Sequence, residues 1–284
     1  MIPAHITQLP VFTAAGVRRA GVSWHELQRA VSAGEVARLK RGWFTAQPMP
    51  WPSDRHRLMV QVELTQRPGL VASHYSAALL LGLPVHTVDW STVHLMRTSA
   101  GRALQRHGLV IHQHVPVAAD LRLALVIAQT TLLCCTSGLM ALDAALAADQ
   151  VTKEQVEAAA RQLVGRSGHS RLATVVRLGD ARRESPLESW TALVYDGWGF
   201  RLQPQFQVPG TNYRADARIV GTTVLLESDG KPKYTESSVL MAEKVREDDL
   251  RARHWQVVRV TSDLLRQPDL LLARTRSALL LAAR

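Results

Sequence analysis

Residues 213–234, YRADARIVGTTVLLESDGKPKY, contain two alternating strand patterns that meet at a glycine. A two-residue turn at Gly221 and Thr222, with glycine first, is of the kind that closes a β-hairpin. This turn would place Asp216 directly opposite Glu227, with Cβ atoms about 4.5–5.5 Å apart. The stretch therefore predicts a hairpin that brings two carboxylates side by side on one face of a sheet.

A divalent cation would relieve the repulsion within this hairpin. Like charges placed opposite each other destabilise a sheet, and Asp229 shares the face of Glu227 because side chains alternate with a period of two. Magnesium prefers carboxylate oxygens and water, and a bound metal ion can activate water for attack on a phosphodiester. We expect Asp216, Glu227 and Asp229 to bind Mg²⁺ or Mn²⁺. A loop-end carboxylate with two solvated edge residues would give the same pattern.

The motif SPLES at residues 185–189 adds a fourth acid. Ser185 can cap a helix that Pro186 starts, which places Glu188 at the third helical position. There Glu188 could complete the metal site or serve a capping box.

Three lysines near the acids could stabilise the negative charge that develops on a phosphate, or could form a solvated basic surface. They are Lys231, Lys233 and Lys244. The expected catalytic set is Asp216, Glu227, Asp229, Glu188, Lys233 and Lys244.

The order of elements after residue 182 is typical of one nuclease fold. Residue patterns predict a helix at 187–195, strands at 201–208, 213–220 and 222–228, a long helix at 237–253, a strand at 256–261 and a helix at 270–283. This αβββαβα order is that of the restriction-endonuclease-like PD-(D/E)XK core. We therefore expect a nuclease-like domain at residues 183–284.

The beginning of the chain predicts a winged helix-turn-helix domain at residues 1–52. Residues 11–33 contain two short helical patterns joined at a glycine, with Ser23 and Glu26 spaced as a capping box. The segment EVARLKRGWFTA at residues 35–46 alternates apolar and basic residues, as a β-wing does.

Two sets of polar residues on this head could contact DNA. The second helix offers His25, Gln28 and Arg29 toward base edges, and the wing offers Arg38, Lys40 and Arg41 toward phosphates. The formal charge of +10 and pI of about 10.4 come mainly from arginine, which binds phosphate and guanine well. A genome rich in G and C would also raise the arginine content, so charge alone leaves both explanations open.

The middle region, residues 53–182, has mixed helical and strand patterns and no catalytic constellation. His112 and His114 share one face of a predicted strand and could bind a metal ion, but no third ligand is predicted near them. The uncharged stretch at residues 123–142 contains several polar residues, which favours a buried strand or helix over a membrane span. The adjacent Cys134 and Cys135 and the lack of a signal peptide predict a cytoplasmic protein.

Two stretches near the C-terminus carry a family resemblance. ESDGKPKY (227–234) and AEKVREDDLRARHWQVVRVTSDLL (242–265) resemble the C-terminal domain of actinobacterial proteins related to the very-short-patch-repair (Vsr) endonucleases. SPLES and the pair Pro204-Gln205 match the start of that domain.

The rest of the chain resembles another family. Residues 11–46 resemble the winged-helix domain of AbiEi-type antitoxins, and residues 73–84 and 139–152 resemble their middle region.

The resemblance places Asp216, Glu227 and Asp229 at nuclease positions and Glu188 at the upstream helical acid. Asp229 stands where the signature lysine is expected, Lys231 and Lys233 replace a double histidine, and Ser228 replaces an aromatic or aliphatic residue. The resemblance therefore implies two functions: a metal-dependent DNA endonuclease guided by the head, or a non-catalytic transcriptional regulator. The regulator could be a type IV toxin–antitoxin antitoxin that forms homodimers or binds a cognate toxin. An RNA-processing nuclease is less favoured, because no RNA-recognition module is evident.

Overall fold

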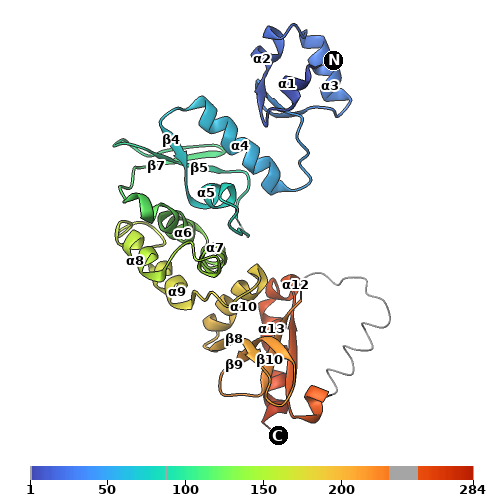
Figure 1. Ribbon diagram of the computed structural model, residues 1–284, viewed down its shortest axis with the longest axis vertical. Helices are drawn as coiled ribbons and strands as arrows, with labels where there is room; N and C mark the ends of the chain where they lie inside the picture. The colour runs from blue at the N-terminus through green and yellow to red at the C-terminus, as the bar shows by residue number, and fades with distance from the viewer. Residues whose placement is uncertain (1, 87, 230–248, 284) are drawn as a thin grey trace.

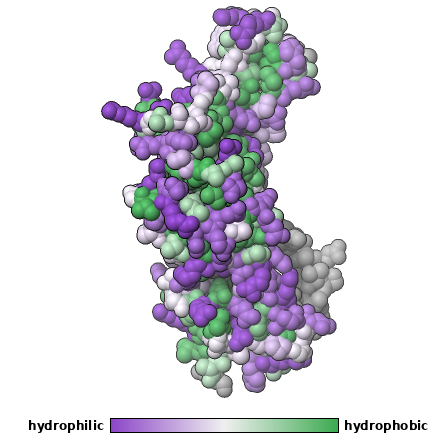
Figure 2. Space-filling model, turned by 60° about the vertical axis from the view of Figure 1, so that its left-hand side comes forward, coloured by the Kyte–Doolittle hydropathy of each residue, from purple (hydrophilic) through white to green (hydrophobic). Residues whose placement is uncertain are grey.

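The computed structural model describes residues 2–86, 88–229 and 249–283. In these residues the chain is an α/β protein with three β-sheets that follow one another along an elongated molecule (Figure 1). Hydrophilic residues cover most of the face seen in Figure 2.

The head has the predicted helix-turn-helix and wing. Its elements are α1 (Ala4–Thr7), β1 (Phe12–Thr13), α2 (Ala14–Arg19), α3 (Trp24–Ser32), β2 (Ala37–Lys40) and β3 (Trp43–Thr45), with strand order β1-β3-β2. The predicted capping box is present, since Ser23 Oγ accepts from Glu26 N at 3.3 Å and Glu26 Oε2 accepts from Ser23 N at 2.9 Å. Gly21, at φ 82°, allows the chain to turn between α2 and α3.

The middle region begins with a second small sheet. Its elements are α4 (Pro52–Gln66), β4 (Leu70–Ala72), α5 (His74–Leu80), β5 (Val93–Arg97), β6 (Leu104–Arg106) and β7 (Leu109–His112), with strand order β4-β5-β7-β6. Strands β5 and β7 are parallel. Val93, Leu95 and Leu109 form a buried cluster with Val60 of α4. The alternate face of β5 and β7 carries His94 and His112.

A helical layer follows the second sheet. It contains the 3-10 helix η1 (Ala119–Leu121) and the helices α6 (Arg122–Leu133), α7 (Cys135–Ala147), α8 (Lys153–Arg161) and α9 (Ser170–Leu178). The uncharged stretch at 123–142 falls in α6 and α7, where Ile127 and Leu139 are fully buried. No helix among the described residues has the length and apolar character needed to cross a membrane.

Among the described residues, the C-terminal elements follow the predicted order of strands and flanking helices. They are α10 (Pro186–Gly197), β8 (Leu202–Gln207), β9 (Arg214–Ile219), β10 (Val224–Ser228), β11 (Gln256–Val260), α12 (Ser262–Leu265) and α13 (Pro268–Ala282). The sheet order is β11-β10-β9-β8, antiparallel except for the parallel pair β10 and β11. Most of the predicted helix at 237–253 lies outside the described residues. The short helix α12 was not predicted.

The predicted hairpin register is confirmed, because Arg218 pairs with Leu225. The turn itself differs in detail: Thr222 N donates to Ile219 O at 3.2 Å, and Gly221 lies at φ 81°. Glycine at this position accommodates the left-handed backbone without a steric cost. The strands therefore keep the expected register although the turn closes one residue earlier.

The boundary predicted between residues 182 and 183 crosses a buried polar network. Asp143 of α7 accepts hydrogen bonds from Arg183 and from Ser189 of α10, each at 2.7 Å. In addition, Met140 of α7 belongs to the same buried cluster as Trp190 of α10. The helical layer and the C-terminal sheet are therefore packed against each other.

Candidate DNA-binding and metal sites

The head presents an exposed basic surface. His25 and Arg29 on α3 are exposed, as are Arg38 and Arg41 in the wing, and Gln28 is half-buried. Residues 1–52 contain six arginines and lysines against two glutamates, a formal excess of four positive charges. The helix and the wing can therefore offer separate cationic contacts to a polyanion.

Lys40 is engaged within the protein. Its Nζ donates to Glu63 Oε1 at 2.5 Å and to Gln66 Oε1 at 2.7 Å, both on α4. Beside it, Arg55 donates to the carbonyl oxygen of Leu39 at 2.6 Å. The structure therefore places this predicted DNA contact at the junction between the wing and α4.

The C-terminal sheet brings the predicted acids into one row. Leu226 pairs with Ala217, and one step further along the same antiparallel register Glu227 lies opposite Asp216. These residues belong to adjacent strands, but their carboxylates have different partners, since Glu227 accepts from the Tyr213 hydroxyl and Asp216 from Ser228 N.

Two further residues extend this row. Pro204 and Phe206 of β8 pair with positions on either side of Asp216, so Gln205 lies opposite Asp216. The amide of Gln205 donates to Glu188 Oε2 of α10 at 2.8 Å. We call Glu188, Gln205, Asp216 and Glu227 the acidic row. Gln205 matters here because it links the helical acid to the sheet.

Each acid of the predicted metal site already has a partner in the protein. Asp216 Oδ2 accepts from Ser228 N at 2.6 Å, and Glu227 accepts from the Tyr213 hydroxyl. Asp229 Oδ2 lies 3.8 Å from an Arg259 nitrogen. Within the described ranges, no three Asp or Glu residues bring their oxygens within 4.8 Å of one another.

The electrostatics of the row favour a positive ligand. Burial raises the pKa of Asp216, the charges of Glu184 and Asp229 raise it further, and the Ser228 N–H counteracts part of the shift. Burial also raises the pKa of Glu188, with a further contribution from Asp216. A cation beside these carboxylates would offset both effects.

The structure describes a positive group beside this site, and the three predicted lysines are not among the described residues. Lys231, Lys233 and Lys244 lie outside the described residues. Arg259 of β11, by contrast, pairs in register with Glu227 and so ends the row with a cation. Arg259 is not predictable from the sequence pattern, because the parallel pairing of β10 with β11 joins segments far apart in the chain.

The middle region contains a group of three histidines that the sequence did not predict as a site. His112 does not act with His114, whose Nδ1 contacts the carbonyl oxygen of Arg97 at 3.0 Å. Instead, ligand atoms of His74, His94 and His112 all lie within 4.8 Å of one another. We call these three residues the histidine cluster. No sequence motif links them, since they come from a helix start and two parallel strands.

The fold defines an α/β protein that joins a helix-turn-helix head with a β-wing to a four-stranded mixed sheet through an α/β middle region. No family model and no curated protein matches the chain. Among solved structures, the chain is similar to the crystal structure of the RV2827C protein from Mycobacterium tuberculosis, with 17% sequence identity and a TM-score of 0.37. The similarity covers 65% of this chain and 75% of that one.

Proposed function

We propose that this chain is a cytoplasmic DNA-binding protein whose head contacts DNA through α3 and the wing. The observation that supports this function is the exposure of Arg29 on α3 together with Arg38 and Arg41 in the wing. Helix residues of a helix-turn-helix contact base edges, and wing cations contact phosphates. Sequence discrimination and overall affinity should therefore depend on different residues.

Fluorescence anisotropy across a salt series tests this role with the full chain. Arg38→Ala combined with Arg41→Ala should weaken binding to all sequences and flatten the log–log salt slope by about two units, one for each lost phosphate contact. Arg29→Ala should lower discrimination between sequences more than affinity. Lys40→Ala should change the slope less, because Lys40 is paired with Glu63.

A matched control removes two exposed arginines from α13, Arg274→Ala with Arg276→Ala. This double variant loses the same charge at the other end of the molecule. If both double variants lose the same DNA affinity, the binding comes from nonspecific attraction by net charge. That result would overturn the proposal that the head binds DNA.

For the C-terminal sheet we propose a metal-dependent DNA endonuclease. The acidic row supports this activity, because Asp216 and Glu227 are adjacent in the sheet register and Gln205, opposite Asp216, donates to Glu188 of α10. The raised pKa values of Asp216 and Glu188 fit a site that gains from a cation. Asp216 and Glu227, with Asp229, would hold Mg²⁺ or Mn²⁺, which supplies Lewis acidity and an activated water for phosphodiester hydrolysis.

The test is incubation of pure protein with plasmid and linear DNA in magnesium, manganese or EDTA. Metal should support nicking and raise the melting temperature, and Asp216→Asn should abolish both effects. Asp120→Asn, an exposed acid on η1, removes the same charge elsewhere and should leave both unchanged. Cleavage that persists in Asp216→Asn, with no metal-dependent rise in melting temperature, would overturn the endonuclease assignment.

A second function, a non-catalytic regulator or antitoxin, is favoured by one specific observation. Asp229 occupies the position of the signature lysine and lies beside Arg259, so the usual cation of the motif is replaced by an acid. Under this function the head binds an operator, while the C-terminal domain serves as a scaffold for a homodimer or a cognate toxin. Sequence-specific binding with no cleavage in any metal would favour it over the endonuclease.

A further inference from the structure

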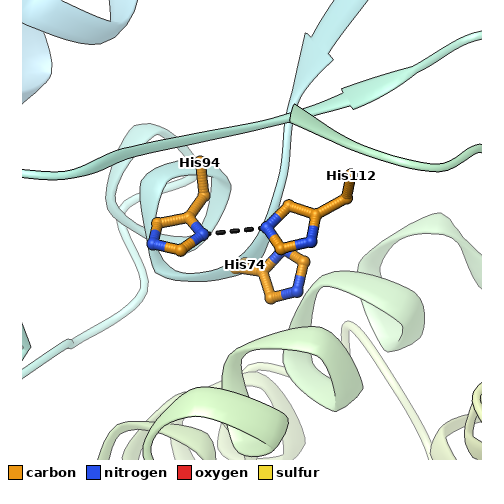
Figure 3. A group of neighbouring side chains, drawn as sticks. All are labelled: His74, His94 and His112. Carbon is orange, nitrogen blue, oxygen red and sulfur yellow. Dashed lines mark hydrogen bonds between the residues drawn. The ribbon is translucent and has the colours of Figure 1, made fainter. Parts of the chain in front are cut away.

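The histidine cluster lies where three separate elements meet in the middle region. His74 begins α5, His94 is on β5 and His112 is on β7, and Figure 3 shows the three rings gathered between the strands and the helices. His74 is 4% exposed and His94 is 7% exposed. Buried polar groups normally have a hydrogen-bond partner, and His74 Nδ1 has one in Ser73 Oγ at 3.0 Å.

The rings of His94 and His112 face each other through their nitrogens. His94 Nδ1 and His112 Nε2 are 2.9 Å apart, the contact drawn in Figure 3. With Zn–N bonds of about 2.0–2.1 Å, two nitrogens of a tetrahedral site lie about 3.3 Å apart. A metal ion could therefore replace the shared proton with a shift of a few tenths of an ångström.

The ring positions fit the same geometry for two of the three pairs. The ring centroids of His94 and His112 are 5.2 Å apart, and those of His74 and His94 are 5.4 Å apart. Imidazoles bound to one tetrahedral zinc ion have centroids about 5 Å apart. His74 and His112 are stacked at 3.8 Å, so the His74 ring would have to swing outward by about 1 Å.

The backbone holds His74 close to the strands. Ser73 N donates to the carbonyl oxygen of His94 at 3.0 Å, and His94 N donates to Ser76 Oγ at 2.9 Å. His74 itself lies at φ 52°, a region sparsely populated by residues other than glycine. Such backbone conformations concentrate at ligand-binding and active sites.

The protonation of the cluster suits metal binding. Burial lowers the pKa of His94 to about 3 and of His112 to about 4, and it holds the pKa of His74 well below its ordinary value. Nearby positive charge from Arg166 lowers the pKa of His74 and His112 further. Neutral imidazole is the form that donates a lone pair to zinc, copper, iron or nickel.

We propose that His74, His94 and His112 form a binding site for one divalent transition-metal ion of the zinc class. The ion ties the start of α5 to two parallel strands, and a water molecule completes its tetrahedron. This site is separate from the acidic row, because it lies on α5, β5 and β7 of the middle region. Its nitrogen ligands also suit a zinc-class ion, whereas magnesium takes oxygens. It does not depend on the nuclease proposal.

The experiment uses untagged, full-length protein that is stripped with a chelator and reloaded with zinc or cobalt chloride. We expect one tightly bound zinc or cobalt ion per chain, visible d–d absorption of tetrahedral cobalt, and a zinc-dependent rise in melting temperature of roughly 5 °C. His94→Gln and His112→Gln should each weaken binding roughly 100-fold or more.

Two controls locate the site. His114→Gln changes the histidine two residues from His112, and Asp216→Asn changes the acidic row; neither should alter zinc affinity. Unchanged binding in His94→Gln, or loss of binding in Asp216→Asn, overturns the proposal. The cobalt spectrum is measured on the wild-type protein, so it tests the proposal even if a histidine variant fails to fold. Absence of tetrahedral d–d bands in this spectrum overturns the proposal.

Discussion

Replacing Asp143 with alanine should destabilise the junction between α7 and α10 strongly. One carboxylate oxygen accepts from Arg183 and from Ser189, each at 2.7 Å, and the other accepts from Asp180 N at 2.7 Å. The Asp143 and Arg183 side chains are only 2% and 6% exposed. Alanine at position 143 would therefore remove the charged partner of the buried Arg183 guanidinium. Among the described residues, Arg183 would keep a hydrogen bond to Leu178 O.

Breaking a buried ion pair from one side costs about 3–5 kcal/mol, because the remaining charge stays desolvated. The matched control is Arg182→Ala, which breaks the neighbouring pair with Asp180. There the arginine side chain is 58% exposed, and exposed pairs contribute about 0–1 kcal/mol. The two variants should therefore differ by at least about 2 kcal/mol in the free energy of unfolding.

Urea unfolding followed by circular dichroism and tryptophan fluorescence measures this difference. The double variant Asp143→Leu with Arg183→Met should recover much of the loss, since well-packed apolar side chains can replace a buried pair at little cost. If Asp143→Ala and Arg182→Ala unfold within 1 kcal/mol of each other, the reasoning from burial is wrong.

Two further predictions concern pH and a close backbone contact. In EDTA, the free energy of unfolding should fall as the pH drops from about 6.5 toward 4. The pKa is about 3 for His94 and about 4 for His112 in the folded protein, so over this range the unfolded chain binds protons that the folded chain does not. Urea midpoints at several pH values check this, and a smaller pH dependence is expected for His94→Gln. Gly168→Ala should lower the melting temperature more than Gly165→Ala: both glycines have positive φ, but a Cβ at Gly168 would lie 2.2 Å from Leu132 O, whereas a Cβ at Gly165 meets nothing within 4 Å. Equal melting temperatures would show that the backbone around Gly168 moves without cost.

Features encoded over a few residues were predictable from the sequence. The capping box of Ser23 and Glu26 follows from a spacing of three, and the hairpin register that sets Asp216 opposite Glu227 follows from side-chain alternation and a glycine turn. Short-range geometry determines both features. The order of strands and helices after residue 182 was predictable for the same reason, whereas α12 was missed.

Contacts between distant segments were decided by the tertiary structure. The wing pattern predicts a phosphate contact for Lys40, yet packing against α4 pairs it with Glu63. Similarly, His112 and His114 share a strand face in the sequence pattern, but the parallel pairing of β5 with β7 selects His94 as the neighbour of His112.

The sequence by itself thus determined the local elements, the positive charge of the head and the alignment of two acids. Only the tertiary structure decided which charges are paired internally and which histidines meet. The physical reason is that periodicity and turn chemistry act over a few residues, whereas parallel strands and packed helices join residues tens of positions apart. Burial of apolar faces determines which of these distant residues meet.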